Sequence, residues 1–74
     1  MSCKPEPALR LRINGEDRHF PGPLTVEGLL ESLGIDRRQV GVERNRTLVP
    51  KKEFPTVGLS DGDVLEIVTF VGGG

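Results

Sequence analysis

The carboxyl terminus is the part of this 74-residue sequence best suited to chemistry, because it follows three consecutive glycines, Gly72, Gly73 and Gly74. Glycines carry no side chain, so an extended tail of them can enter a narrow channel in another protein. Extended, residues 71–74 reach about 13 Å beyond the preceding strand. The group at the tip is a carboxylate with a pKa of about 3.5, so it is ionised at neutral pH and is a poor electrophile. Its activation, for example as an acyl phosphate anhydride, must therefore come from a partner.

Other catalytic or metal-binding arrangements find little support in the sequence. It contains no G-x-x-x-x-G-K-[ST] phosphate loop, and one histidine with one cysteine cannot hold a structural zinc. His19 lies in a polar segment and is interpreted as solvated, and Cys3 lies in a segment broken by two prolines. Asp61 and Asp63 flank Gly62, a pattern more typical of a turn than of a cation site. We therefore expect no metal, no cofactor held by this chain and no activity of its own as an enzyme.

Composition narrows the partners and the location. Ten Lys and Arg against eleven Asp and Glu give a net charge of -1, which supplies no field for nucleic acid or an anionic membrane. Three Phe without Tyr or Trp do not favour a base-stacking platform. A single cysteine indicates a reducing compartment, and the short apolar runs exclude a membrane span or signal peptide. We expect a cytoplasmic protein. The basic pairs at 37–38 and 51–52, with Arg44 and Arg46, are interpreted as solvated faces, and any of them could contribute to docking.

The first half of the chain predicts a hairpin followed by one helix. Apolar and polar residues alternate over 9–13, Asn14-Gly15 is a strong hairpin signal, and residues 16–20 form a short polar return strand near an edge. Thr25 can cap a helix whose apolar stripe recurs at helical spacing, and Gly34 is placed to end it.

The second half predicts three more short strands. They cover 40–45, 46–49 and 64–71, with a turn at Asn45-Arg46 and an irregular connection at 51–56 that plugs Phe54 into the core. One amphipathic helix needs one apolar sheet face to cover, which indicates an α+β domain with a mixed four- to five-stranded sheet. The first and last strands should lie side by side and parallel, since the helix supplies the crossover. The organisation expected is a disordered tail over 1–7, a domain over 8–71 and a flexible tail over 72–74.

The last strand has two apolar faces. Leu65 and Ile67 share one parity, while Val68 and Phe70 share the other. If the helix covers the first face, Val68 and Phe70 point away from it, beside the glycine tail. We interpret them as a docking patch for a partner; the alternative is a wider core in which loops bury both faces.

Residues 8–74 resemble the ThiS family of sulfur carriers in thiamin biosynthesis, which are ubiquitin-like β-grasp proteins. The segments that carry the resemblance are Ile13-Asn14-Gly15-Glu16, Thr25-Val26 with Leu29-Leu30, Val42-Glu43-Arg44-Asn45, Val49-Pro50, Asp61-Gly62-Asp63, Leu65-Glu66-Ile67-Val68 and Phe70-Val71-Gly72-Gly73-Gly74. The stretch Met1 to Pro7 is a departure, because such proteins often begin at the first strand.

The resemblance implies a carrier that partner enzymes act upon. A ThiF-like adenylating enzyme would use Mg-ATP to convert the Gly74 carboxylate to an acyl-adenylate, and a cysteine desulfurase persulfide would supply the sulfur of a Gly74 thiocarboxylate. Thiazole synthase, ThiG, would then take that sulfur. Gly73 and Gly74 would be the reactive end, Gly72 and Val71 the threading tail, and Val68 and Phe70 the docking surface.

Three alternatives stay open at this stage. The chain could be a carrier of the same fold for molybdopterin, tRNA thiolation or cysteine synthesis. It could be a modifier joined to lysines through the same activated glycine. It could also be an interaction module with an inert tail, in which case removal of residues 72–74 would have no effect.

Overall fold

The computed structural model describes residues 8–70, and the expectations for residues 1–7 and 71–74 lie outside them. The hairpin is formed by β1 (Ala8–Ile13) and β2 (Glu16–Pro21), joined where Asn14 and Gly15 both take a positive φ, as the Asn-Gly pair predicted. The helix α1 (Val26–Leu33) begins at Thr25, whose hydroxyl accepts from the Gly28 N–H, and ends at Gly34 with φ 72°. Both predicted caps are therefore confirmed.

The second half contains β3 (Val40–Arg44), β4 (Thr47–Val49) and β5 (Val64–Thr69), with 3₁₀ turns at Arg37–Gln39 and Lys51–Glu53. Together with β1 and β2, these three strands form one five-stranded mixed sheet in the order β2-β1-β5-β3-β4. The central pair β1 and β5 is parallel, with Ile13 beside Leu65, and the other neighbours are antiparallel. The predicted central pairing and the edge position of β2 are both confirmed.

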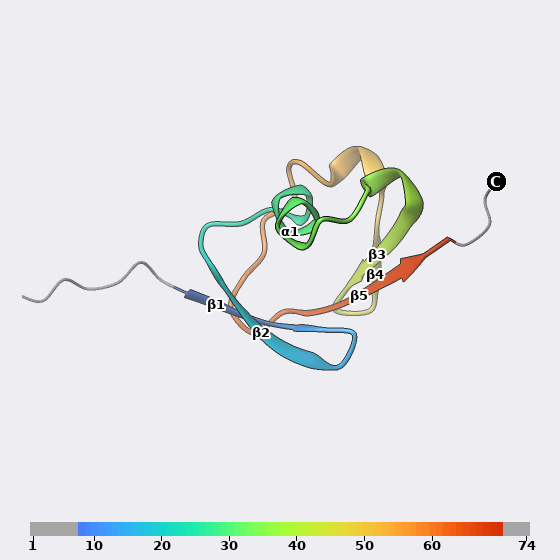
Figure 1. Ribbon diagram of the computed structural model, residues 1–74. Coiled ribbons are helices and arrows are strands. Elements are labelled where there is room, and N and C mark those ends of the chain that lie inside the picture. Colours follow the sequence, from blue (N-terminus) through green and yellow to red (C-terminus); the bar gives the residue numbers. More distant parts are fainter. Residues whose placement is uncertain (1–7, 71–74) are drawn as a thin grey trace, which may run out of the picture.

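One face of this sheet wraps around α1, and the other is open (Figure 1). The core lies between helix and sheet, and its largest fully buried side chain is Phe54, as predicted. The buried apolar residues are Leu11, Ile13, Phe20, Val26, Leu29, Leu30, Val40, Val42, Val49, Phe54, Leu59, Leu65 and Ile67. This is the β-grasp arrangement. No helix within residues 8–70 is long and apolar enough to cross a membrane.

Candidate functional site

Val68 and Phe70 lie where β5 ends and the chain leads on to its carboxyl terminus. Both point to the open face of the sheet, and they are 55% and 54% exposed. Their exposure is as predicted, because α1 covers the face that holds Leu65 and Ile67. The other four predicted site residues, Val71, Gly72, Gly73 and Gly74, lie outside the described residues.

Two further apolar side chains share the open face, which we call the outer face. Leu48 on β4 is 65% exposed and Val64 on β5 is 45% exposed. The strand register places Val68 beside Gly41, and Glu43 beside Leu48. Neither Leu48 nor Val64 was predicted to contribute to docking. The signal for Leu48 was its alternation with buried Val49, which places it on the opposite side of a short strand.

Phe70 is held in place although half of its surface is exposed. Its N–H donates to the Gln39 carbonyl at 2.8 Å, and its ring lies over Gly41. A Cβ on Gly41 would come within 3.2 Å of the Phe70 Cζ atom, so the absence of a side chain there makes room for the ring. The Lys51 ammonium lies 5.5 Å from the ring centroid while it donates to the Arg38 carbonyl at 3.0 Å. Lys51 was interpreted as a solvated cation. In the structure its ammonium also faces the Phe70 ring.

An acidic pair lies within the outer face. Glu43 and Glu66 are opposite each other on β3 and β5, and both are exposed. The four ion pairs among residues 8–70 include neither of them. Like charges directly opposite in a sheet are destabilising. The outer face therefore combines exposed apolar side chains with two carboxylates that form none of these ion pairs, which suits a partner surface with basic residues.

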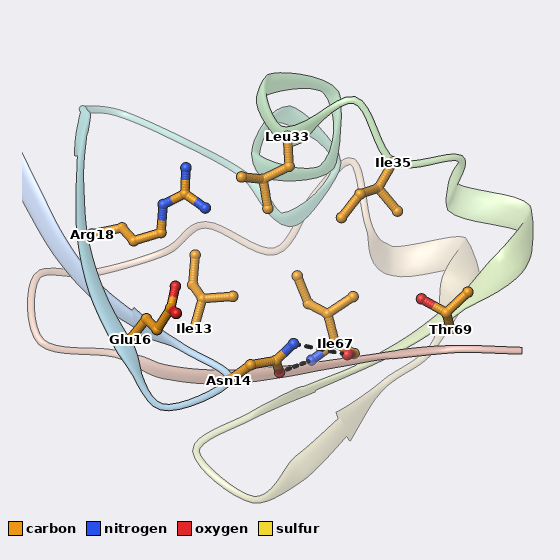
Figure 2. Close-up of a pocket in the computed structure, with 8 residues that line it drawn as sticks. All are labelled: Ile13, Asn14, Glu16, Arg18, Leu33, Ile35, Ile67 and Thr69. Atoms are coloured by element: carbon orange, nitrogen blue, oxygen red, sulfur yellow. Dashed lines mark hydrogen bonds between the residues drawn. The ribbon is translucent and has the colours of Figure 1, made fainter.

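Asn14 extends the pairing of β5 where β1 has ended (Figure 2). Its backbone N–H donates to the Leu65 carbonyl at 3.0 Å. Its side-chain amide makes the two hydrogen bonds that the backbone of a paired strand residue would make. Nδ2 donates to the Ile67 carbonyl at 3.1 Å, and Oδ1 accepts from the Ile67 N–H at 2.8 Å. Asn14 was predicted only to form the turn. Its φ of 52° confirms the turn, and the pairing of its side chain with Ile67 is an additional role.

The beginning of β5 is held from its other side by Asn45 and a buried carboxylate, Asp63. The Asn45 N–H donates to the Val64 carbonyl at 2.7 Å, its Oδ1 accepts from the Val64 N–H at 3.0 Å, and its Nδ2 donates to Asp63 Oδ1 at 3.1 Å. Asp63 Oδ2 accepts from Arg44 Nε and from the Ser60 N–H, each at 2.8 Å. The interpretation of Arg44 as a solvated cation is therefore wrong, because the sheet brings it against a carboxylate 19 residues away.

Asp63 is 7% exposed, and its environment favours the ionised form. Burial alone raises the pKa of this carboxyl group. The hydrogen bonds from the Ser60 N–H, Arg44 and Asn45, together with the Arg44 charge, outweigh burial and hold the pKa below the usual value of 3.8. The turn at 60–63 is confirmed, and Asp63 stabilises it by closing back on Ser60. Among residues 8–70, no group of three or more His, Cys, Asp or Glu could hold a metal ion.

A groove of about 390 Å³ lies beside the last residues of β5, between the end of α1 and the β1–β2 hairpin (Figure 2). Ile13 and Ile67 rise from the sheet, and Leu33 and Ile35 come down from the helix end. Its lining also includes Asn14, Glu16, Arg18 and Thr69. The groove lining therefore combines four aliphatic side chains with four polar ones. The groove lies on the opposite side of the sheet from Val68 and Phe70.

Comparison with known proteins gives one consistent result. A family model described as the ThiS family matches residues 11–74. The sulfur carrier protein ThiS of Bacillus subtilis is 42% identical over 65 residues, which cover 86% of this chain and 98% of that protein. A crystal structure of the thiamine biosynthesis protein ThiS from Geobacter metallireducens superposes with a TM-score of 0.76 at 32% identity, covering 89% of this chain and all of that one.

Larger proteins contain a similar segment. The thiazole synthase of Paramagnetospirillum magneticum is 54% identical over 66 residues, which are 89% of this chain. A second thiazole synthase, from Magnetococcus marinus, is 38% identical over the same length. In both cases the chain spans 20% of the length of the relative.

Proposed function

The chain belongs to the ThiS family of sulfur carriers in thiamin biosynthesis, and from this premise we propose that it carries sulfur as a thiocarboxylate on Gly74. The observation that supports the proposal is the extent of the family match, which runs to residue 74 and so includes the terminal glycines. The chain itself contributes an acceptor group and a docking surface, and partner enzymes contribute the catalysis.

Loading of sulfur onto Gly74 takes three chemical steps. A Gly74 carboxylate oxygen attacks the α-phosphorus of Mg-ATP on a ThiF-like enzyme, and pyrophosphate leaves. The terminal sulfur of a desulfurase persulfide attacks the carbonyl carbon, and AMP leaves with the electron pair of the broken C–O bond. A thiol then attacks the desulfurase cysteine sulfur of the resulting acyl disulfide. A new disulfide forms with that cysteine, the original S–S bond breaks, and the Gly74 thiocarboxylate leaves with its electron pair. Activation is required because a free carboxylate is a poor electrophile at neutral pH.

The outer face is the surface that we assign to the adenylating enzyme. Phe70 is positioned by its backbone hydrogen bond and by Gly41, so little side-chain freedom is lost when a partner covers its ring. The neighbouring acidic pair, Glu43 and Glu66, would be compensated by basic residues of the partner. The carrier would then be oriented before the tail enters the active site.

Thiazole synthase is the acceptor that we propose for the sulfur. Support comes from the two thiazole synthases that contain a segment similar to this chain, since one polypeptide keeps a carrier and its acceptor together. Linking two modules raises their effective concentration to roughly the millimolar range for short linkers. A separate carrier must obtain the same encounter through its own surface.

Release of pyrophosphate from ATP by a purified ThiF-like enzyme tests the first step. We expect release to depend on this chain and to vanish when Gly74 is deleted. Phe70→Ala should raise the KM for the chain roughly tenfold with little change in kcat, because truncation of an interface anchor costs more than about 1 kcal/mol. His19→Ala on the edge strand β2 is the matched control and should leave KM unchanged. Full release with the Gly74 deletion would contradict the proposal.

A further inference from the structure

Strand β5 continues past the end of its parallel neighbour (Figure 1). The paired residues of β1 and β5 end at Ile13 and Leu65, and the Asn14 side chain covers the next position, at Ile67. Thr69 is one position further along the same edge. No strand residue within 8–70 lies opposite Thr69 on that side.

The hydrogen-bonding direction of β5 shows that the Thr69 backbone faces this open side. Even-numbered residues bond toward β3: the Phe70 N–H donates to Gln39, and the Val64 carbonyl accepts from Asn45. Odd-numbered residues bond toward β1, as Leu65 and Ile67 do with Asn14. Because the two sides alternate along a strand, the N–H and C=O of Thr69 point away from β3. They form a short, unprotected strand edge of the kind that another chain can pair with.

The groove described above lies directly beside this edge, and Thr69 is part of its lining (Figure 2). Leu33 and Ile35, both half-buried, form its helix side, and Ile67 forms its sheet side. A strand added along the edge would turn alternate side chains toward the helix side of the sheet. The groove can receive one aliphatic side chain from such a strand.

We propose that an extended segment of thiazole synthase adds as a short strand to the Thr69 edge and inserts an aliphatic side chain into this groove. The inference rests on the proposed function, since it concerns the acceptor of the Gly74 sulfur. Gly74 is five residues beyond Thr69, and five extended residues span about 17 Å. An enzyme that takes sulfur from Gly74 therefore works within about 17 Å of this edge, close enough for its surface to contact it. Strand addition supplies backbone affinity, and the groove supplies side-chain selectivity.

The edge and the outer face are distinct surfaces. The groove opens on the helix side of the sheet, whereas Val68 and Phe70 point to the other side. Substitutions at the edge should therefore affect thiazole synthase and leave docking through the outer face unchanged.

Thr69→Pro tests the proposal, because proline removes the N–H that faces the open side and leaves the bonds to β3 in place. Proline is tolerated at such edge positions. Thr69→Val is the matched control, since it keeps the N–H and the β-branched shape. We expect Thr69→Pro to bind purified thiazole synthase about tenfold more weakly, as for the loss of one interfacial hydrogen bond with its partner left unpaired. Thr69→Val should bind like the unaltered chain.

Loading is measured separately, by mass, with the ThiF-like enzyme. Normal loading of Thr69→Pro with weakened binding to thiazole synthase supports the inference. Normal loading with unchanged binding overturns it, and so does a loss of loading alone, which would assign the edge to the adenylating enzyme. Failure of the unaltered chain to load would instead contradict the proposed function.

A second pair of variants tests the groove if Thr69→Pro does not fold. Ile35→Glu places a charge at the groove and should weaken binding to thiazole synthase at least tenfold, because burying a charge without a partner is costly. Ile35→Val removes one methylene and should change the affinity for thiazole synthase less than threefold. Equal affinities for the two variants would overturn the proposal. Slower hydrogen exchange of the Thr69 amide in the complex would support strand addition directly, and unchanged exchange would contradict it.

Discussion

Replacing Asp63 with asparagine should destabilise the domain far more than its position in a surface turn suggests. The carboxylate accepts from the Ser60 N–H, Arg44 Nε and Asn45 Nδ2, and it is 7% exposed. An asparagine side chain has the same shape but only one oxygen. Whichever way its amide is turned, the NH₂ group meets at least one of these donors, and the Arg44 charge loses its partner.

The expected loss in the free energy of unfolding is about 2–3 kcal/mol. A buried donor left unpaired costs about 1–3 kcal/mol, and removing one partner of a fully buried ion pair costs about 3–5 kcal/mol. The Arg44 side chain is 32% exposed, so water compensates part of that second cost. For a domain of this size, about 2–3 kcal/mol corresponds to a fall in Tm of roughly 10–20 °C.

Asp61→Asn is the matched control, because it makes the same chemical change two residues away. Asp61 is exposed and its carboxylate accepts one hydrogen bond, from the Arg10 N–H at 2.7 Å. We expect a loss below about 1.5 kcal/mol. Circular dichroism melts of both variants at pH 7 measure the difference. A Tm for Asp63→Asn within about 3 °C of the unaltered chain would refute the reasoning.

The effect of Asp63 should also depend on pH. Its pKa in the folded chain is lowered, so its carboxylate stabilises the fold above the unfolded pKa of about 3.9. This stabilisation is lost as the pH falls through the lower folded pKa. The Tm gap between the unaltered chain and Asp63→Asn should therefore be constant from pH 7 to 5 and shrink below about pH 4. A gap that persists undiminished into strong acid would contradict this account.

Two further predictions concern the strand that leads to the tail. Asn14→Ala removes both side-chain hydrogen bonds to Ile67 and should speed hydrogen exchange of the Ile67 amide at least tenfold. In Asn14→Gly the Ile67 amide should exchange equally fast, but the Tm should be higher than in Asn14→Ala because glycine tolerates the positive φ. Unchanged exchange in both variants would contradict the pairing role of Asn14. Glu66→Lys replaces repulsion on the outer face with attraction and should raise stability by about 0.2–1 kcal/mol while it raises the KM of the adenylating enzyme; a lowered KM would show that the partner surface is not basic there.

The order of elements and the outer-face residues could be predicted because their signals are local. Alternation over residues 9–13 and the Asn14-Gly15 turn fixed the hairpin, and Thr25 and Gly34 marked the ends of α1. The parity of β5 then separated Ile67 from Val68 once a single helix was expected to cover one face.

The roles that could not be predicted depend on register between distant segments. Arg44 meets Asp63 only because β3 pairs with β5, and Asn14 reaches Ile67 across 53 positions of the sequence. Gly41 makes room for Phe70 for the same reason. Composition and spacing do not give the register between strands that are distant in the sequence, so a charged side chain such as Arg44 looks solvated until the sheet is assembled.

The most direct test is the intact mass of the chain after co-expression with a ThiF-like enzyme and a cysteine desulfurase. The account predicts a mass increase equal to the replacement of one oxygen by sulfur, mapped to Gly74 by fragmentation and absent when Gly74 is deleted. An unshifted mass, with pyrophosphate release by the same enzyme confirmed, would contradict the claim that this chain carries sulfur at its terminus.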